Sequence, residues 1–90
     1  MKHIYKSIVK TMEDDERDAR MQIGYAEDAE ECGEHELAQL HRQEAEERIH
    51  DMKRWCETAR TRFGNAELGD ILIDHFHAQT EELERLIRRL

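Results

Sequence analysis

The sequence predicts an all-α protein, in which a long antiparallel helical hairpin is followed by a third helix. Three observations lead to this fold class. The ninety residues include no proline and only four glycines, so little in the chain interrupts a long helix. Residues that favour helices, Glu, Arg, Leu and Ala, are abundant. Apolar residues recur at steps of three and four. We therefore expect one helical domain over residues 1–90, with helices at about 2–31, 35–62 and 66–90.

The first expected helix carries an acid on its apolar face. Its apolar stripe includes Met12 and Ala19, and Glu16 lies between them where an apolar residue is expected, with Asp15 at the edge of the stripe. Burying a carboxylate is costly unless it is paired. Two interpretations stay open: Glu16 binds a cation, or it lies at a hydrated seam or pairs with an arginine of another helix. Gly33 marks the end of this helix.

The second expected helix has two neighbouring stripes. One is apolar except for a histidine, and its members are Ala38, His41, Ala45, Ile49, Met52, Cys56, Ala59 and Phe63. The other begins apolar and becomes acidic, and its members are Leu37, Leu40, Glu44, Glu47 and then His50 or Asp51. The second stripe is typical of a bundle interior with a metal site, and equally of a solvent-facing flank.

Glu47 and His50 form a Glu-x-x-His pair, whose side chains leave one face of a helix and can bind one cation. In a hairpin that turns near residue 33, residues face each other when their numbers sum to roughly 67. Glu16 and His50 therefore lie at the same height. A carboxylate opposite a Glu-x-x-His pair is half of a di-iron site. Fifteen glutamates and six histidines give about one such pair by chance, so its weight comes from its context: it lies on an expected helix, opposite an acid that interrupts an apolar stripe.

The third expected helix has the most regular apolar stripe, with steps of three and four like those of a coiled coil. Its members are Ile73, Phe76, Thr80, Leu83, Ile87 and Leu90.

Residues 12–52 resemble ferritin-like proteins, in particular the two-helix hairpin of rubrerythrin-like and encapsulated-ferritin-like members. The matching pieces are Asp14-Asp15-Glu16, Ala19, Tyr25-Ala26, Ala29-Glu30-Glu31-Cys32-Gly33, Glu36-Leu37-Ala38 and Glu46-Glu47-Arg48-Ile49-His50. The resemblance implies a ferritin-like bundle that binds iron, and oxidation of Fe²⁺ for iron storage or peroxide detoxification. The implied metal ligands are Glu16, Glu47 and His50, with Asp15 and Glu44 in reserve. Aligned without a gap from Gly33, however, the Glu and His positions fall on Arg48 and Asp51.

One chain supplies only half of such a site, because a di-iron bundle takes ligands from four helices. We therefore expect a homodimer or higher homo-oligomer that completes a four-helix-type bundle and forms the site at its interface. Ferroxidase-like activity follows only if the iron site is real, so whether the protein is an enzyme stays open at this point.

The acidic charge supports a competing function. The net charge is −8, and residues 1–50 carry 14 acids against 7 bases. This balance disfavours direct binding of nucleic acid or of an anionic membrane. It favours a small acidic interaction protein, such as a phage-type inhibitor or DNA mimic, that binds a basic protein surface without catalysis. A third alternative is a plain dimerisation module.

The compartment is expected to be the cytoplasm. No apolar run is long enough to cross a membrane, and no signal peptide is evident. The two cysteines, Cys32 and Cys56, are expected to be free and far apart.

Overall fold

The computed structural model describes residues 2–63 and 67–90, and the side chains of residues 6–62 and 71–90. All regular structure in these ranges is helical. Helix α1 spans Lys2–Glu31, α2 spans His35–Phe63 and α3 spans Glu67–Arg88. These bounds agree with the expected helices to within two residues, although the expected start of the third, residue 66, lies outside the described residues. The all-α prediction is confirmed.

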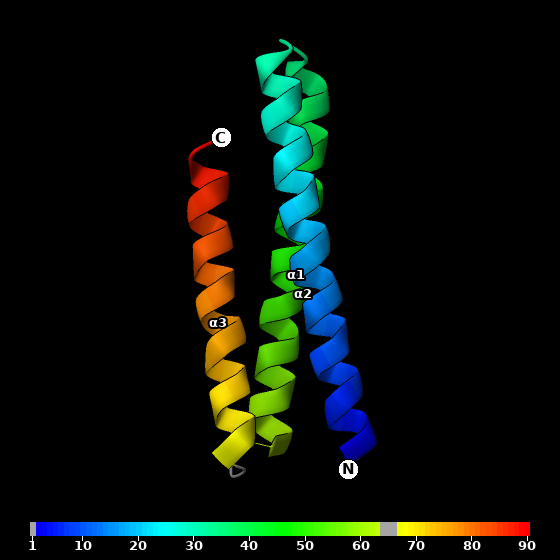
Figure 1. Ribbon diagram of the computed structural model, residues 1–90, viewed down its shortest axis with the longest axis vertical. Helices are drawn as coiled ribbons and strands as arrows, with labels where there is room; N and C mark the ends of the chain where they lie inside the picture. The colour runs from blue at the N-terminus through cyan, green and yellow to red at the C-terminus, as the bar shows by residue number, and fades with distance from the viewer. Residues whose placement is uncertain (1, 64–66) are drawn as a thin grey trace.

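The three helices form a rod with extents of 48 × 20 × 14 Å (Figure 1). Helices α1 and α2 run antiparallel along its whole length. Helix α3 is shorter, so the closed end of the hairpin projects beyond the C-terminus. In the described part of the chain, no helix has the length and apolar character that crossing a membrane requires.

The turn between α1 and α2 depends on Gly33, which has a φ of 76°. The amide of Glu34 donates to the carbonyl of Ala29 at 2.8 Å, and the amide of Gly33 donates to the carbonyl of Glu30 at 3.0 Å. This pair of bonds is a Schellman motif, which satisfies carbonyls left free at a helix end. Glu34 then accepts from the amide of Ala38 at 3.0 Å, so α2 begins at once and folds back on α1.

Small residues let α1 and α2 approach closely, because alanine adds little bulk between the helix axes. The buried alanines are Ala19, Ala26, Ala29, Ala38, Ala45 and Ala59. Larger side chains fill the core where α3 joins the hairpin. The core cluster comprises Ile8, Met12, Ala19, Ile23, Ala45, Ile49, Met52, Cys56, Ala59, Ile73, Phe76, Leu83 and Ile87.

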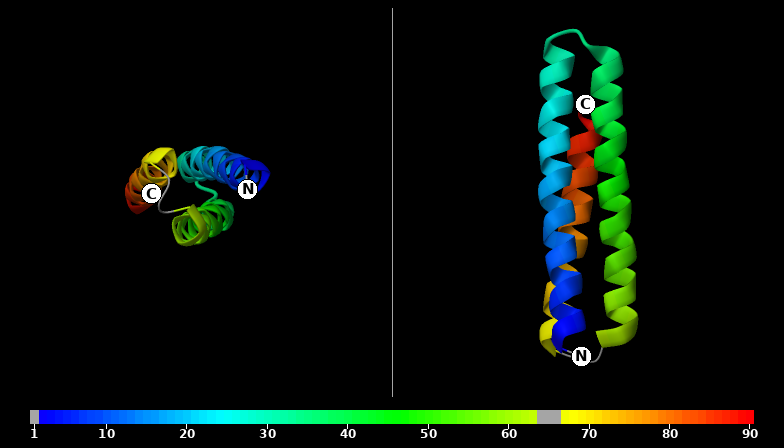
Figure 2. Two further views of the ribbon diagram at one scale, coloured as in Figure 1. Left: turned by 90° about the horizontal axis from the view of Figure 1, so that it is seen from below. Right: turned by 90° about the vertical axis from the view of Figure 1, so that its right-hand side faces the viewer.

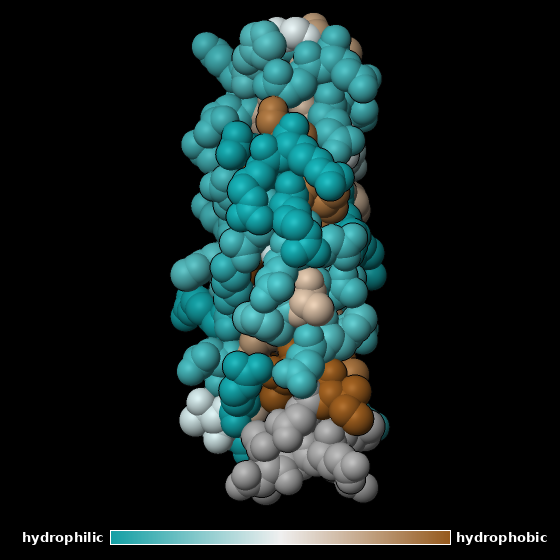
Figure 3. Space-filling view, turned by 90° about the vertical axis from the view of Figure 1, so that its left-hand side faces the viewer, coloured by the Kyte–Doolittle hydropathy of each residue, from teal (hydrophilic) through white to brown (hydrophobic). Residues whose placement is uncertain are grey.

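The face that α3 presents to solvent is largely hydrophilic (Figure 3). Apolar side chains are visible on it mainly toward the end where α3 begins, and there Ile71 is 61% exposed.

Both cysteines are free, as expected, with Cys32 exposed at the hairpin turn and Cys56 buried in the core. The Cys56 thiol lies 3.7 Å from the Met12 sulfur, and burial raises its pKa.

Candidate functional site

Two rows of side chains, one on α1 and one on α2, line the side of the hairpin that is turned away from α3. Both rows contain polar and apolar residues. Figure 2 shows this side in its right-hand view, with α3 behind the two hairpin helices. On each helix the positions follow steps of three and four, so they share one helical face. We call this surface the open face. Its residues are Asp15, Asp18, Gln22 and Tyr25 of α1, and Leu37, His41, Glu44, Arg48, Asp51 and Trp55 of α2.

Contacts between the two rows define the open face toward the hairpin turn. The His41 Nδ1 atom donates to Gln22 Oε1 at 2.7 Å, and the His41 ring lies 5.3 Å from the Tyr25 ring, centroid to centroid. Tyr25 and Leu37 remain 46% and 42% exposed. His41 thus joins α1 to α2 while apolar surface beside it stays open to solvent.

The middle of the open face is a carboxylate cluster around one guanidinium. Arg48 Nε lies 3.9 Å from Asp18 Oδ2, and Arg48 Nη1 lies 3.6 Å from Asp51 Oδ2. Asp15 faces the same group, and its Oδ2 atom is buried without a hydrogen-bond partner. Desolvation, together with repulsion from Asp51, raises the pKa of Asp15, while Arg48 partly offsets both.

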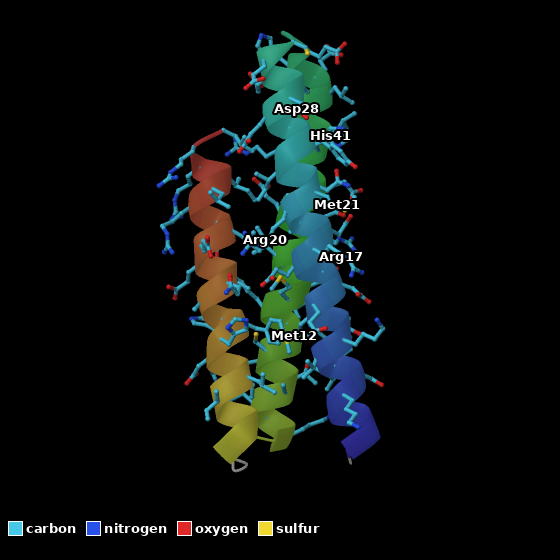
Figure 4. The ribbon with its side chains drawn as sticks, in the orientation of Figure 1. Met12, Arg17, Arg20, Met21, Asp28 and His41 are labelled. Atoms are coloured by element: carbon cyan, nitrogen blue, oxygen red, sulfur yellow. The ribbon has the colours of Figure 1, made fainter. Side chains whose placement is uncertain are left out.

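Glu16 turns to the other side of α1. Its Oε2 atom lies 3.8 Å from Arg20 Nε, and its side chain is 24% exposed. Arg20 in turn donates to Gln79 Oε1 of α3 at 2.9 Å and lies 3.5 Å from Glu82 Oε2. In Figure 4, Arg20 lies on the α3 side of α1 and His41 on the opposite side of the hairpin. The Glu16 Oε1 atom is buried without a hydrogen-bond partner. Glu16 is therefore paired with an arginine of its own helix, and not with one of another helix as the second interpretation had it.

Glu47 and His50 do not point to α1. Glu47 is 66% exposed by its side chain, and its described contact is with Arg48 Nη2 at 3.7 Å. His50 is exposed and lines a shallow hollow with Lys53 of α2 and Glu84 of α3. The reason is the apolar stripe of α2: the buried Ala45 and Ile49 flank Glu47 two positions away on either side, which turns Glu47 about 160–200° from the core.

The predicted height was close to that observed, whereas the rotation of α2 differs. Pairs that meet across the hairpin have numbers that sum to between 63, for Gln22 and His41, and 68, for Met12 and Cys56. Within that register, the α2 positions beside Asp15 and Asp18 are Arg48 and Asp51. These are the two positions at which the gap-free alignment placed the ferritin-like Glu and His.

Among the described residues, no group of three or more His, Cys, Asp or Glu side chains is placed to hold a metal ion. Glu16, Glu47 and His50 of one chain do not converge on one point. Glu44 is exposed on the open face, and no contact joins it to these three residues in the described part of the chain. The cation that lies among the carboxylates of the open face is the guanidinium of Arg48. The predicted iron site stays a prediction that only a second chain could complete.

From the sequence, Arg48 and Asp51 were named as the positions of the gap-free alignment but were not grouped with Trp55 on one helical face. The sequence does contain the pattern that joins them: positions 37, 41, 44, 48, 51 and 55 alternate steps of four and three.

Comparison with protein-family models, with curated proteins and with solved structures finds no match to this chain. What the chain does is therefore inferred from its residues and their arrangement.

Proposed function

We propose that this chain is a small acidic helical interaction protein that binds a basic protein surface through its open face, without catalysis. The supporting observation is that solvent-exposed aromatic and aliphatic side chains lie on the same side of the hairpin as a carboxylate cluster. Trp55, Tyr25 and Leu37 are 36%, 46% and 42% exposed. Aromatic side chains are enriched at protein–protein interfaces, where their area supplies much of the affinity.

The charge of the open face specifies the chemistry of the partner. The face carries four carboxylates, those of Asp15, Asp18, Glu44 and Asp51, against the single guanidinium of Arg48, so its net charge is −3 with His41 neutral. A basic partner gains both attraction during approach and neutralisation after docking. Phosphate groups of nucleic acids or lipids would be repelled.

Charge reversal at one open-face position tests this function. Wild type, Glu44→Lys and Glu57→Lys are immobilised and exposed to soluble proteins of the source cells at about 0.05 M and about 0.5 M salt, because added salt shortens the reach of surface charges. Glu44 and Glu57 are both exposed on α2, and only Glu44 lies on the open face. A protein retained by wild type and Glu57→Lys, and lost with Glu44→Lys or high salt, is then purified and its dissociation constants are measured.

A basic partner whose affinity falls at least about tenfold in Glu44→Lys, and less than about twofold in Glu57→Lys, supports the proposal. Equal affinity for all three proteins, or affinity indifferent to salt, contradicts it.

Iron binding keeps one supporting observation, the buried oxygens of Asp15 and Glu16 that have no hydrogen-bond partner. The residues of one chain do not fit a di-iron centre, so this second function needs a homodimer. Anaerobic titration with Fe²⁺ compares wild type with Glu47→Ala and His50→Ala. Stoichiometric binding by wild type alone, with a higher melting temperature, would favour the iron protein. Equal binding and equal thermal shifts in all three exclude this site.

A further inference from the structure

We infer that the occupant of the open face is a single basic amphipathic helix of the partner protein, about five turns long, with lysine or arginine in its middle and apolar residues at both ends. This inference rests on the proposed function and adds the shape and the residue order of the partner.

The order of side chains along the open face determines the order in the partner. Trp55 lies at one end, where it lines a shallow hollow with Asp51, Arg54 and Thr58. Tyr25 and Leu37 lie at the other end, near the hairpin turn. The carboxylates lie between the two ends. The face is therefore apolar, then acidic, then apolar, and its complement is apolar, then basic, then apolar.

The length follows from helix geometry. Leu37 and Trp55 are eighteen positions apart on α2. At 1.5 Å per residue they are separated by about 27 Å along the helix axis. A partner helix of about eighteen residues reaches both apolar ends while its middle lies over the carboxylates.

A helix fits this surface better than a strand. The open face belongs to two continuous helices, whose backbone groups are bonded within each helix, so no sheet edge is offered for strand addition. Side chains on both helices are spaced by three and four, which is the spacing that the ridges of a third helix match. A helix lying in this surface would extend the bundle on the side opposite α3.

A second copy of the chain is disfavoured as the occupant. Two open faces brought together would oppose eight carboxylates with two guanidinium groups, giving a net charge of −6 within one contact. Like charges held together across an interface weaken binding. A basic helix removes this repulsion.

Two synthetic peptides of identical composition test the residue order. Both are amphipathic helices of about eighteen residues. One has leucines on its apolar face at both ends and lysines in the middle, and the other has the leucines in the middle and the lysines at both ends. Trp55 is the one tryptophan of the chain and lies on the open face, so its emission reports binding at that face directly. Each peptide is titrated into wild type, Glu44→Lys and Glu57→Lys, and circular dichroism checks that all three proteins are folded.

We expect the peptide with central lysines to shift Trp55 emission to the blue and to bind wild type at least about tenfold more tightly than the other peptide. Glu44→Lys should weaken this binding about tenfold, and Glu57→Lys should leave it within about twofold. Equal affinity of wild type for the two peptides overturns the inferred residue order and leaves the acidic docking face standing. Equal affinity of the two protein variants, or no change in Trp55 emission with either peptide, overturns the inference and the proposed function together.

Discussion

At the scale of single residues, Arg48 lies among carboxylates of the open face. Its guanidinium lies 3.6–3.9 Å from carboxylates of Asp18, Glu47 and Asp51, and its Nε atom has no hydrogen-bond partner. Ion pairs of this length at a partly exposed site contribute about 0–1 kcal/mol each. Arg48 is therefore better understood as the counter-charge that lets several carboxylates share one face than as a main source of stability.

Asp15 should destabilise the folded protein at neutral pH. Its pKa is raised above the ordinary 3.8, first by desolvation and then by repulsion from Asp51. A carboxyl whose pKa rises on folding is protonated in both states well below pH 3.8, where it costs the folded state nothing, and it destabilises the folded state progressively as the pH rises through the folded-state pKa. Asp15→Asn is therefore expected to stabilise the folded protein at pH 7, by no more than about 1 kcal/mol, and so to raise its melting temperature. Near pH 3 the substitution is expected to have no effect.

Thermal unfolding monitored by circular dichroism at both pH values checks this prediction. Asp14→Asn is the matched control. Asp14 is ion-paired with Lys10 and Arg17 at 3.9 and 2.7 Å, so this variant should be slightly less stable than wild type. A stabilising effect of Asp15→Asn that is as large at pH 3 as at pH 7 would show that charge is not its cause.

At the scale of the elements, the residues of the turn itself determine where α1 ends and where α2 begins. Gly33 takes the left-handed conformation that closes α1, and the bonds of Gly33 and Glu34 satisfy its last carbonyls. No basic residue occupies the last turn of α1, where one would complement the helix dipole. The hairpin turn is closed by these backbone bonds, and one side-chain contact spans it, between His35 Nδ1 and Glu30 Oε2 at 3.0 Å.

The two described glycines of α1 and its turn should respond oppositely to alanine. Neither Gly24 nor Gly33 has an atom that a new methyl group would meet within 4 Å, so packing does not distinguish them. Gly33→Ala should lower the free energy of unfolding by about 1 kcal/mol, because an L-residue is strained at positive φ. Gly24→Ala, inside α1, should raise it by about 0.5–1 kcal/mol. Urea denaturation of both variants provides the measurement, and a stabilised Gly33→Ala would contradict the role assigned to the turn.

At the scale of the whole molecule, α3 completes the core of the lower part of the rod and leaves the closed end of the hairpin free (Figure 1). Ile73, Phe76 and Leu83 of α3 are at most 3% exposed. Charged pairs also bridge α3 to its neighbours, among them Lys53 and Glu84 at 2.6 Å. The side of the hairpin opposite α3 keeps Tyr25, Leu37 and Trp55 exposed, and this side, which α3 does not cover, is the basis of the proposed docking face.

Removal of one large side chain from α3 should test how much the core depends on it. Phe76→Ala is expected to lower the free energy of unfolding by about 3 kcal/mol, through lost burial and the cavity left behind. Ile71→Ala, on the same helix but 61% exposed, should change it by less than about 0.5 kcal/mol. Chemical denaturation followed by circular dichroism measures both, and similar losses in the two variants would mean that α3 does not pack as described.

Local chemistry in the sequence was sufficient to predict the helices, their bounds and the turn. The absence of proline, the position of Gly33 and the steps of three and four each act within a few residues, so they can be recognised without knowledge of the fold. The apolar stripe of α3 was predicted in the same way: its Ile73, Phe76, Thr80, Leu83 and Ile87 are buried, and its last member, Leu90, is partly buried. The height at which the two hairpin helices meet followed from the turn.

The rotation of α2 about its own axis was decided only by tertiary packing. Two neighbouring stripes competed for the interior, and adjacent residues on a helix differ by 100°, so a change of one residue moves a side chain from the α1 contact to solvent. Ala45, Ile49 and Met52 are buried because the alanine-rich seam lets α1 and α2 approach closely there. That packing puts Arg48 and Asp51 beside α1 and leaves Glu47 and His50 in solvent.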